Sequence, residues 1–259
     1  MRTNDPIILI HAFPLDSAMW TPVAENLRAA GHTVHTPDLP GFGKRAIWPM
    51  ERYSIEVLAE DIHALILQQA GGHAIVGGCS VGGYILLSLL RHHPELVSAA
   101  MFFDTHPAAD SPEAVVNRIK TIADVTSEGL APLADIMAKR LLSPQTAPTL
   151  HSVVAAIIAR QSTEGVIGLQ YAMAKRSNQS DLLPKLKIPT LLIVGAEDHL
   201  TPPAMMQAMA EKFTMQPPPR LVVIPAAGHL AVLEQPELVS QALREFVQPQ
   251  KPVSPRRLP

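Results

Sequence analysis

The sequence is poor in cysteine and in charge, and neither sign of charge is in clear excess. Cys79 is the single cysteine among 259 residues, which excludes an intrachain disulfide and a cysteine-cluster metal site. The 21 lysines and arginines nearly balance 23 aspartates and glutamates, which argues against nucleic acid or an anionic membrane as a partner. With 47% hydrophobic residues, the chain can bury a core that offsets its conformational entropy, so a disordered chain is also excluded.

Membrane-directing segments are missing as well. Residues 1–6 lead directly into a short apolar stretch, without the charged region and apolar helix of a signal peptide. Residues 71–90 contain no acidic residue, lysine or arginine, but a glycine-rich turn divides them into a β-type piece and a helical piece. Because a single cysteine suits a reducing compartment, we expect a cytoplasmic protein without membrane partners, either a monomer or a small homo-oligomer.

Short apolar segments alternate with longer segments of helical period. The pattern predicts strands at residues 7–11, 33–36, 74–76, 97–103, 190–194 and 221–224. It predicts helices at residues 21–30, 54–69, 81–93, 202–213 and 236–247. This alternation indicates an α/β fold in which a mostly parallel sheet of about six strands has helices on both faces.

Between residues 106 and 187 the alternation stops and the sequence has helical character throughout. We predict a core made of residues 1–105 and 188–247, and a helical cap, residues 106–187, inserted after the fourth strand. If this insertion lies at the carboxyl ends of the strands, it covers the usual ligand crevice; a set of packing helices with no gating role is the alternative. Residues 248–259 are proline-rich and are predicted to be a flexible tail.

Proline is abundant, with 25 residues, and its positions help to locate helix starts. Thr21-Pro22, Ser111-Pro112 and Thr201-Pro202 each pair an N-cap residue type with proline at the first helical position, where its missing N–H costs nothing. We therefore expect a helix to begin at each of these three pairs.

The strongest chemical signal is the pentapeptide Gly78-Cys79-Ser80-Val81-Gly82, which follows a predicted strand and precedes a predicted helix. In that context G-x-S-x-G is typical of a nucleophile elbow, a tight turn that projects the serine hydroxyl. Ser80 is therefore the candidate nucleophile. Cys79 is the alternative, although a lone cysteine beside the central position is more often an inert buried residue.

A serine nucleophile needs a base, and the base needs an acid that orients it. His229 follows the last predicted strand and is the candidate base among 11 histidines. Asp198 follows the penultimate strand and is the candidate acid, in the chain order Ser80, Asp198, His229. Two carboxylates remain alternatives: Glu197, which is adjacent, and Asp104, which ends the fourth strand but could instead hold the start of the insertion by local hydrogen bonds.

The reaction also needs two N–H donors where negative charge develops on the substrate oxygen. We expect one donor to be the backbone N–H of Val81, directly after the nucleophile. The other should come from the loop after the first strand, where Phe13 is the best candidate. His11 in the same loop is expected to stabilise the loop.

Three segments together resemble the α/β-hydrolase superfamily: residues 11–16 (HAFPLD), 38–43 (DLPGFG) and 78–84 (GCSVGGY), completed by Asp198 and Gly228-His229. Within the superfamily the chain is similar to small carboxylesterases and 3-oxoadipate enol-lactonase-like members that have a helical cap. The resemblance implies a serine hydrolase and, since serine occupies the elbow, argues against dehalogenase or epoxide hydrolase chemistry.

The sequence thus predicts a hydrolase of carboxylic esters that acts through an acyl-enzyme, with no metal and no organic cofactor. A small-molecule ester is the expected substrate, and a lactone is equally compatible with this set of residues. The alternative from another functional class is a ligand-binding or signalling protein that keeps these residues but turns over little substrate.

Overall fold

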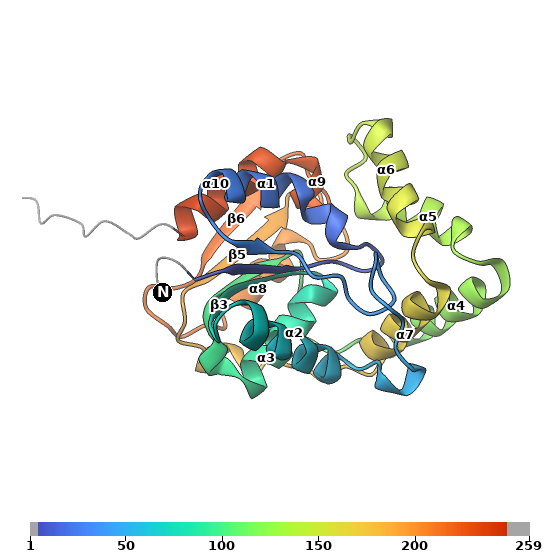
Figure 1. Cartoon of the computed structure of the whole chain (residues 1–259). Helices are drawn as coiled ribbons and strands as arrows, with labels where there is room; N and C mark the ends of the chain where they lie inside the picture. Colours follow the sequence, from blue (N-terminus) through green and yellow to red (C-terminus); the bar gives the residue numbers. More distant parts are fainter. Residues whose placement is uncertain (1–4, 248–259) are drawn as a thin grey trace, which may run out of the picture.

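The computed structural model describes residues 5–247, so the predicted tail at 248–259 lies outside the described residues. Six strands form one sheet: β1 (Ile7–Ile10), β2 (Val34–His35), β3 (Ala74–Cys79), β4 (Val97–Phe103), β5 (Thr190–Gly195) and β6 (Arg220–Ile224). Their order is β2-β1-β3-β4-β5-β6, and every neighbouring pair is parallel. The predicted α/β class with a parallel sheet of about six strands is confirmed (Figure 1).

Helices cover both faces of this sheet. One layer contains α1 (Thr21–Ala29), the short α9 (Ala231–Glu234) and α10 (Pro236–Val247), and the opposite layer contains α2 (Ile55–Gln69), α3 (Val81–His92) and α8 (Pro203–Ala210) (Figure 1). Single 3-10 turns occur at Ser17–Trp20, Met50–Arg52, Pro94–Leu96 and Leu183–Lys185. Two hydrophobic clusters fill the spaces between the sheet and these layers.

The strands supply both clusters because successive side chains point to opposite faces of a sheet. Ile8 and Ile10 pack in the cluster with α2 and α3, whereas Ile7 and Leu9 pack in the cluster with α1 and α10. Each of these four side chains is fully buried. Burial on both faces explains why the strands appear in the sequence as continuous apolar runs.

The structure extends β3 beyond the predicted strand at 74–76, through two glycines to Cys79. A Cβ atom on Gly77 would lie 2.8 Å from the Leu9 side chain, so the glycine here allows neighbouring strands to pack closely. The predicted end of the strand at these glycines is therefore wrong. The extension carries β3 directly to Ser80.

Between β4 and β5 the chain forms α4 (Pro112–Glu128), α5 (Ala131–Leu141), α6 (Pro148–Ala159) and α7 (Thr163–Ala174). Figure 1 shows these four helices gathered at one end of the sheet, away from the two flanking layers. Ser111 caps α4 by accepting a hydrogen bond from the Ala114 N–H, as expected of the Ser111-Pro112 pair.

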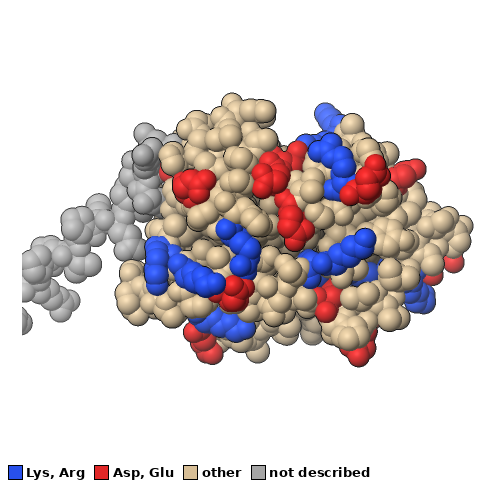
Figure 2. Space-filling view, turned by 90° about the horizontal axis from the view of Figure 1, so that it is seen from below, with Lys and Arg blue, Asp and Glu red and all other residues tan. Residues whose placement is uncertain are grey.

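None of the helices in the described part of the chain has both the length and the apolar character of a membrane span. Basic and acidic side chains are interspersed on the face in Figure 2, and neither sign forms a broad continuous area there.

Candidate active site

The predicted site residues all follow the carboxyl ends of strands, which lie at one edge of the parallel sheet. Phe13 comes after β1 and Ser80 after β3, and these two strands are direct neighbours, with Ile10 opposite Gly78. Asp198 follows β5 and His229 follows β6. The chain order of the strands reverses at β1, and such a switch point is where ligands bind in open α/β sheets.

Ser80 occupies a strained turn between β3 and α3. Its φ is 52° and its ψ −112°, a left-handed conformation that is unfavourable for a residue with a side chain. The turn is held by hydrogen bonds from the Ser80 N–H to the Phe103 carbonyl at 2.9 Å and from the Gly83 N–H to the Ser80 carbonyl at 2.9 Å. The Ser80 hydroxyl is thereby presented at the sheet edge.

The flanking glycines are required because the backbone approaches very closely at this turn. A Cβ on Gly78 would lie 2.2 Å from the Gly82 carbonyl oxygen, and one on Gly82 would lie 2.4 Å from the Ile10 carbonyl oxygen. Any larger residue would push α3 away from β3 or β1. The pentapeptide pattern therefore has a steric cause in this structure.

Asp198 and His229 form a buried pair. His229 Nδ1 lies 2.8 Å from Asp198 Oδ2, and the two side chains are 3% and 0% exposed. Burial raises the pKa of Asp198, but the charge and hydrogen bond of His229 and the hydrogen bonds from Thr201 outweigh it and hold that pKa well below its usual range. Asp198 is therefore an ionised acceptor that fixes the His229 ring with Nδ1 protonated, leaving Nε2 to accept a proton.

Thr201 is a member of the site that the sequence analysis missed. Its hydroxyl donates to Asp198 Oδ2, and its backbone N–H donates to Asp198 Oδ1 at 3.1 Å. The predicted helix start at Thr201-Pro202 is one residue early, since α8 begins at Pro203. The position of Thr201 before proline predicts a helix cap. In the structure its hydroxyl binds the buried Asp198 carboxylate instead.

Asp104 lies beside the pair and is completely buried. Its Oδ1 accepts a hydrogen bond from the Gly195 N–H on β5 at 2.8 Å, while its Oδ2 has no hydrogen-bond partner within the described residues. The sequence offered local hydrogen bonds to the start of the insertion as the role of Asp104, but its carboxyl binds β5 instead. Burial, followed by the negative charge of Asp198, raises the pKa of Asp104 well above its usual range and favours its protonated form.

The two remaining alternatives, Glu197 and Cys79, form no hydrogen bond with His229 within the described residues. Glu197 accepts hydrogen bonds from Ser143 and Gln145 in the turn between α5 and α6. The Cys79 side chain is completely buried, and burial, followed by the charges of Asp104 and Asp198, raises the pKa of its thiol well above the usual value. A buried thiol with a raised pKa forms little of the reactive thiolate.

The two expected donors to the substrate oxygen lie on either side of Ser80. Val81 begins α3 and Phe13 lies in the loop after β1; within residues 5–247 neither backbone N–H donates a hydrogen bond to another protein group. His11 stabilises the Phe13 loop, because its Nε2 accepts from the Leu39 N–H at 2.9 Å and its Nδ1 donates to the Ala12 carbonyl at 3.0 Å. Burial lowers the pKa of His11, which keeps this ring neutral.

A cavity of about 280 Å³ opens over these residues. Phe13, Ser80 and His229 form one side of it, and residues of α4, α5 and α7 form the other. The volume is at the lower end of the range for small-molecule sites. Ser80 and His229, the histidine paired with Asp198, therefore line the same cavity.

Two groups of side chains in the described chain could contact a metal ion. The first is Asp104, Asp198 and His229, in which His229 Nδ1 already binds Asp198. The second is Glu60, His63 and His93, where Glu60 contacts both imidazoles at 3.1 and 2.8 Å. Glu60 is exposed, and these residues belong to α2 and the end of α3 and do not line the cavity.

Comparison with known proteins agrees with this architecture. The model of a family described by the alpha/beta hydrolase fold matches residues 5–236. The solved structure of a thermophilic esterase from Thermogutta terrifontis shares 36% sequence identity, with a TM-score of 0.88 over 94% of this chain and 89% of that one. A Mycobacterium tuberculosis H37Rv protein named as a non-heme bromoperoxidase is 30% identical over 252 residues, 94% of each chain. The enol-lactonase of Burkholderia xenovorans LB400, at 24% identity and a TM-score of 0.83 over 94% and 92% of the chains, shares the fold.

Proposed function

Because the chain belongs to the alpha/beta hydrolase fold family and is similar to the solved esterase, we propose that it hydrolyses carboxylic esters with Ser80 as nucleophile. The observation that carries the proposal is the buried Asp198–His229 pair, 2.8 Å apart, where His229 lines the same cavity as the strained Ser80. An ionised acid, an oriented imidazole and a projected hydroxyl are the three parts that acyl transfer requires.

In the proposed reaction, His229 Nε2 takes the proton of the Ser80 hydroxyl while Oγ attacks the ester carbonyl carbon. The imidazolium that forms is stabilised by Asp198. The proton then passes from His229 to the departing alcohol and leaves an acyl-enzyme. Water, deprotonated by the same nitrogen, attacks the acyl carbon and releases the acid and Ser80.

We assign the oxyanion hole to the backbone N–H groups of Phe13 and Val81. Both belong to rigid elements, since Val81 opens α3 and the Phe13 loop is held by His11 and by the contact of the Ala12 N–H with Met19 Sδ at 3.1 Å. Donors that have no acceptor in the protein can bind the developing negative charge without first breaking a hydrogen bond.

We also propose that residues 106–187 act as a cap over residues 1–105 and 188–247. The support is that three of the four helices between β4 and β5, namely α4, α5 and α7, supply ten of the cavity-lining residues: Ala114, Asn117, Arg118, Thr121, Leu133, Met137, Arg140, Leu141, Gln170 and Met173. A wall of this kind excludes water from the ester and determines which acyl groups fit.

The proposal is tested with purified protein on short-chain p-nitrophenyl esters. Wild type is expected to turn over these esters, and Ser80→Ala and His229→Ala to lose at least about three orders of magnitude in kcat. His63→Ala serves as the control, because His63 lies on the surface of α2, outside the cavity.

Absence of turnover, or turnover that Ser80→Ala leaves intact, contradicts the esterase proposal. If ligands bind without turnover, the alternative of a ligand-binding or signalling protein is favoured instead. A parallel series of lactones separates an esterase from a lactonase, since both would use the same residues.

A further inference from the structure

The cavity wall opposite Ser80 carries positive charge. Arg118 on α4 and Arg140 at the end of α5 line the cavity, and the described lining contains no aspartate or glutamate. Asn117, Thr121 and Gln170 add uncharged polar groups to the same wall. An apolar acyl chain alone would form no hydrogen bond with these groups.

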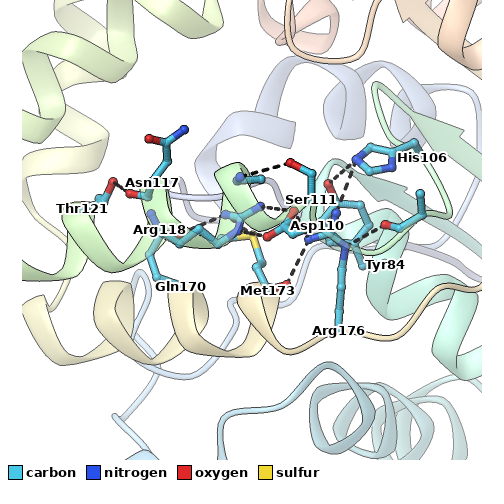
Figure 3. A network of polar contacts seen from close by, with 12 residues as sticks. Tyr84, His106, Asp110, Ser111, Asn117, Arg118, Thr121, Gln170, Met173 and Arg176 are labelled. Carbon is cyan, nitrogen blue, oxygen red and sulfur yellow. Dashed lines mark hydrogen bonds and ion pairs between the residues drawn. The ribbon is translucent and has the colours of Figure 1, made fainter.

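The charge of Arg118 is not cancelled by its neighbours. Its Nε and Nη2 both contact the Asp110 carboxylate, but Arg176 Nη1 also binds that carboxylate at 2.6 Å (Figure 3). Two guanidinium groups therefore share one carboxylate, and one net positive charge remains. The side chains of Arg176 and Asp110 are 3% and 6% exposed, so this pair is complete without Arg118.

His106 adds no charge to this network at neutral pH. Burial, followed by the positive charge of Arg176, lowers the pKa of His106 to about 4, so its ring is neutral at neutral pH. Its Nε2 lies 3.3 Å from the Tyr84 hydroxyl and 3.4 Å from Arg176 Nη2. The Arg176 guanidinium also stacks on the Tyr84 ring, 4.1 Å from its centroid. These contacts hold the Arg176 side chain in place against Asp110 and Tyr84. Arg118 is the arginine of this cluster that lines the cavity.

Arg118 has hydrogen-bonding capacity to spare. Of its five N–H groups, the one on Nε and one on Nη2 bind Asp110, and Nη1 binds Gln170 Oε1 at 2.9 Å and Met173 Sδ at 3.4 Å. The second N–H of Nη2 has no acceptor among the residues that the structure describes. Figure 3 shows Asn117 and Thr121 on the same helix as Arg118.

We propose that this wall binds a free carboxylate of the substrate, so that the ester cleaved at Ser80 is a half-ester of a short dicarboxylic acid. The cluster of Arg118, Arg176 and Asp110 carries one net positive charge, and a carboxylate could accept a charge-assisted hydrogen bond from the N–H that Arg118 keeps without a protein acceptor. The cavity of about 280 Å³ limits the acid to a few carbons between its two ends. This inference rests on the ester hydrolysis proposed above.

The test compares two esters with the same acyl chain, monomethyl glutarate and dimethyl glutarate, near pH 7.5. Wild type is expected to prefer the monoester. In Arg118→Gln the ratio of kcat/KM for the monoester to that for the diester should fall about tenfold or more, mainly through KM, since a charge-assisted hydrogen bond is lost. Arg118→Lys keeps the charge and should retain part of the preference.

Lys120→Gln is the matched control, because Lys120 lies on the same helix, is 73% exposed and does not line the cavity. It removes the same charge from α4 and should leave the ratio unchanged. A similar loss in Lys120→Gln would mean that the preference comes from the general field of the protein, and the carboxylate subsite would be wrong.

Binding separates this inference from the esterase proposal. Calorimetry with the Ser80→Ala protein should detect monomethyl glutarate, with affinity that falls as salt increases and that Arg118→Gln removes. If wild type hydrolyses neither ester, the esterase proposal fails while this measurement still tests the subsite. If both esters are hydrolysed equally well, or the Ser80→Ala protein binds the monoester no better than the diester, the subsite is refuted. Should Arg118→Gln not fold, inhibition of wild type by glutarate is measured instead. Competitive inhibition supports the subsite, and its absence refutes it.

Discussion

Two aspartates that neighbour the same histidine have pKa values shifted in opposite directions, lowered for Asp198 and raised for Asp104. Asp198 accepts hydrogen bonds from His229, Thr201 and the Leu200 N–H, which stabilise its ionised form. Asp104 accepts a single hydrogen bond, from Gly195, and is completely buried. Two nearby negative charges in a buried site oppose each other's ionisation, and the carboxyl that accepts more hydrogen bonds is favoured to keep its charge. The roles of the two residues are therefore separated by their surroundings.

We predict that Asp104→Asn retains most of the esterase activity, whereas Asp198→Asn loses at least about a hundredfold in kcat/KM. An asparagine at position 104 is neutral, like the protonated form that the raised pKa of Asp104 favours, and its oxygen can still accept from the Gly195 N–H. At position 198 the same change removes the charge that stabilises the His229 imidazolium.

The pH dependence of kcat/KM gives an independent check on this assignment. If Asp104 were ionised, Asp104→Asn would remove a negative charge near His229 and shift the acid limb of the profile to lower pH. An unchanged acid limb supports a protonated Asp104. Greater loss in Asp104→Asn than in Asp198→Asn would reverse the assignment of the acid.

At the scale of elements, the helices between β4 and β5 are joined to the core loops by a small set of polar contacts. Asp16, after β1, accepts from Arg160 Nε at 2.9 Å and from Gln161 Nε2 at 2.9 Å. The Ser162 hydroxyl donates to the Gly41 carbonyl at 2.8 Å. On the other side, Glu234 accepts from the Ser143 N–H at 2.7 Å. These contacts align the helical wall of the cavity with the loops that hold Phe13 and His229.

We predict that Asp16→Ala lowers the free energy of unfolding by about 2 kcal/mol and loosens α6 and α7. The change removes the bidentate contact with Arg160 and the cap that Asp16 provides to the Ala18 N–H at 2.9 Å. Hydrogen exchange should become faster in α6 and α7 while α2 stays protected.

Asp181→Ala is a suitable control, because Asp181 also pairs with an arginine, Arg91, but is 56% exposed and does not line the cavity. Exposed ion pairs contribute little, so its hydrogen exchange should resemble that of wild type. Equal protection of α6 in Asp16→Ala and wild type would mean that apolar packing alone holds these helices.

The sequence predicts the elements of the fold better than it predicts the contacts between them. The strands, the flanking helices and the turn at Ser80 follow from local patterns of apolar residues, glycine and proline. The contacts of Asp16 with Arg160, of Asp104 with Gly195 and of Asp198 with Thr201 depend on how distant loops meet in space. Thr201 carried a signal, since a hydroxyl three residues after a candidate acid can bind it, but its position before proline favoured the interpretation as a helix cap.

At the scale of the whole molecule, His106 makes the stability depend on pH. Burial and the charge of Arg176 lower its pKa from 6.5 to about 4, so the native state keeps the ring neutral. Between these two pH values the unfolded chain binds a proton that the native protein does not, and the native state is therefore destabilised as the pH falls. Above pH 6.5 neither the native nor the unfolded state binds this proton, so His106 causes no loss of stability there.

We predict that His106→Asn abolishes this part of the acid sensitivity. The free energy of unfolding of wild type minus that of the variant should decrease by at most about 3 kcal/mol from pH 6.5 to pH 4. Urea unfolding at several pH values measures both free energies. Taking the difference cancels the titration of other groups. A difference that does not vary with pH would show that His106 titrates normally in the native protein.

The four helices from Pro112 to Ala174 form one continuous stretch of chain, inserted between neighbouring strands that pair directly with each other. This arrangement allows recombination to exchange the helical wall as a single piece, with the residues after β1, β3, β5 and β6 left in place. A donor segment would need to supply partners for Asp16, the Gly41 carbonyl and Glu234. New substrate ranges could then be built on an unchanged reaction centre, provided that these three points of attachment are copied with the wall.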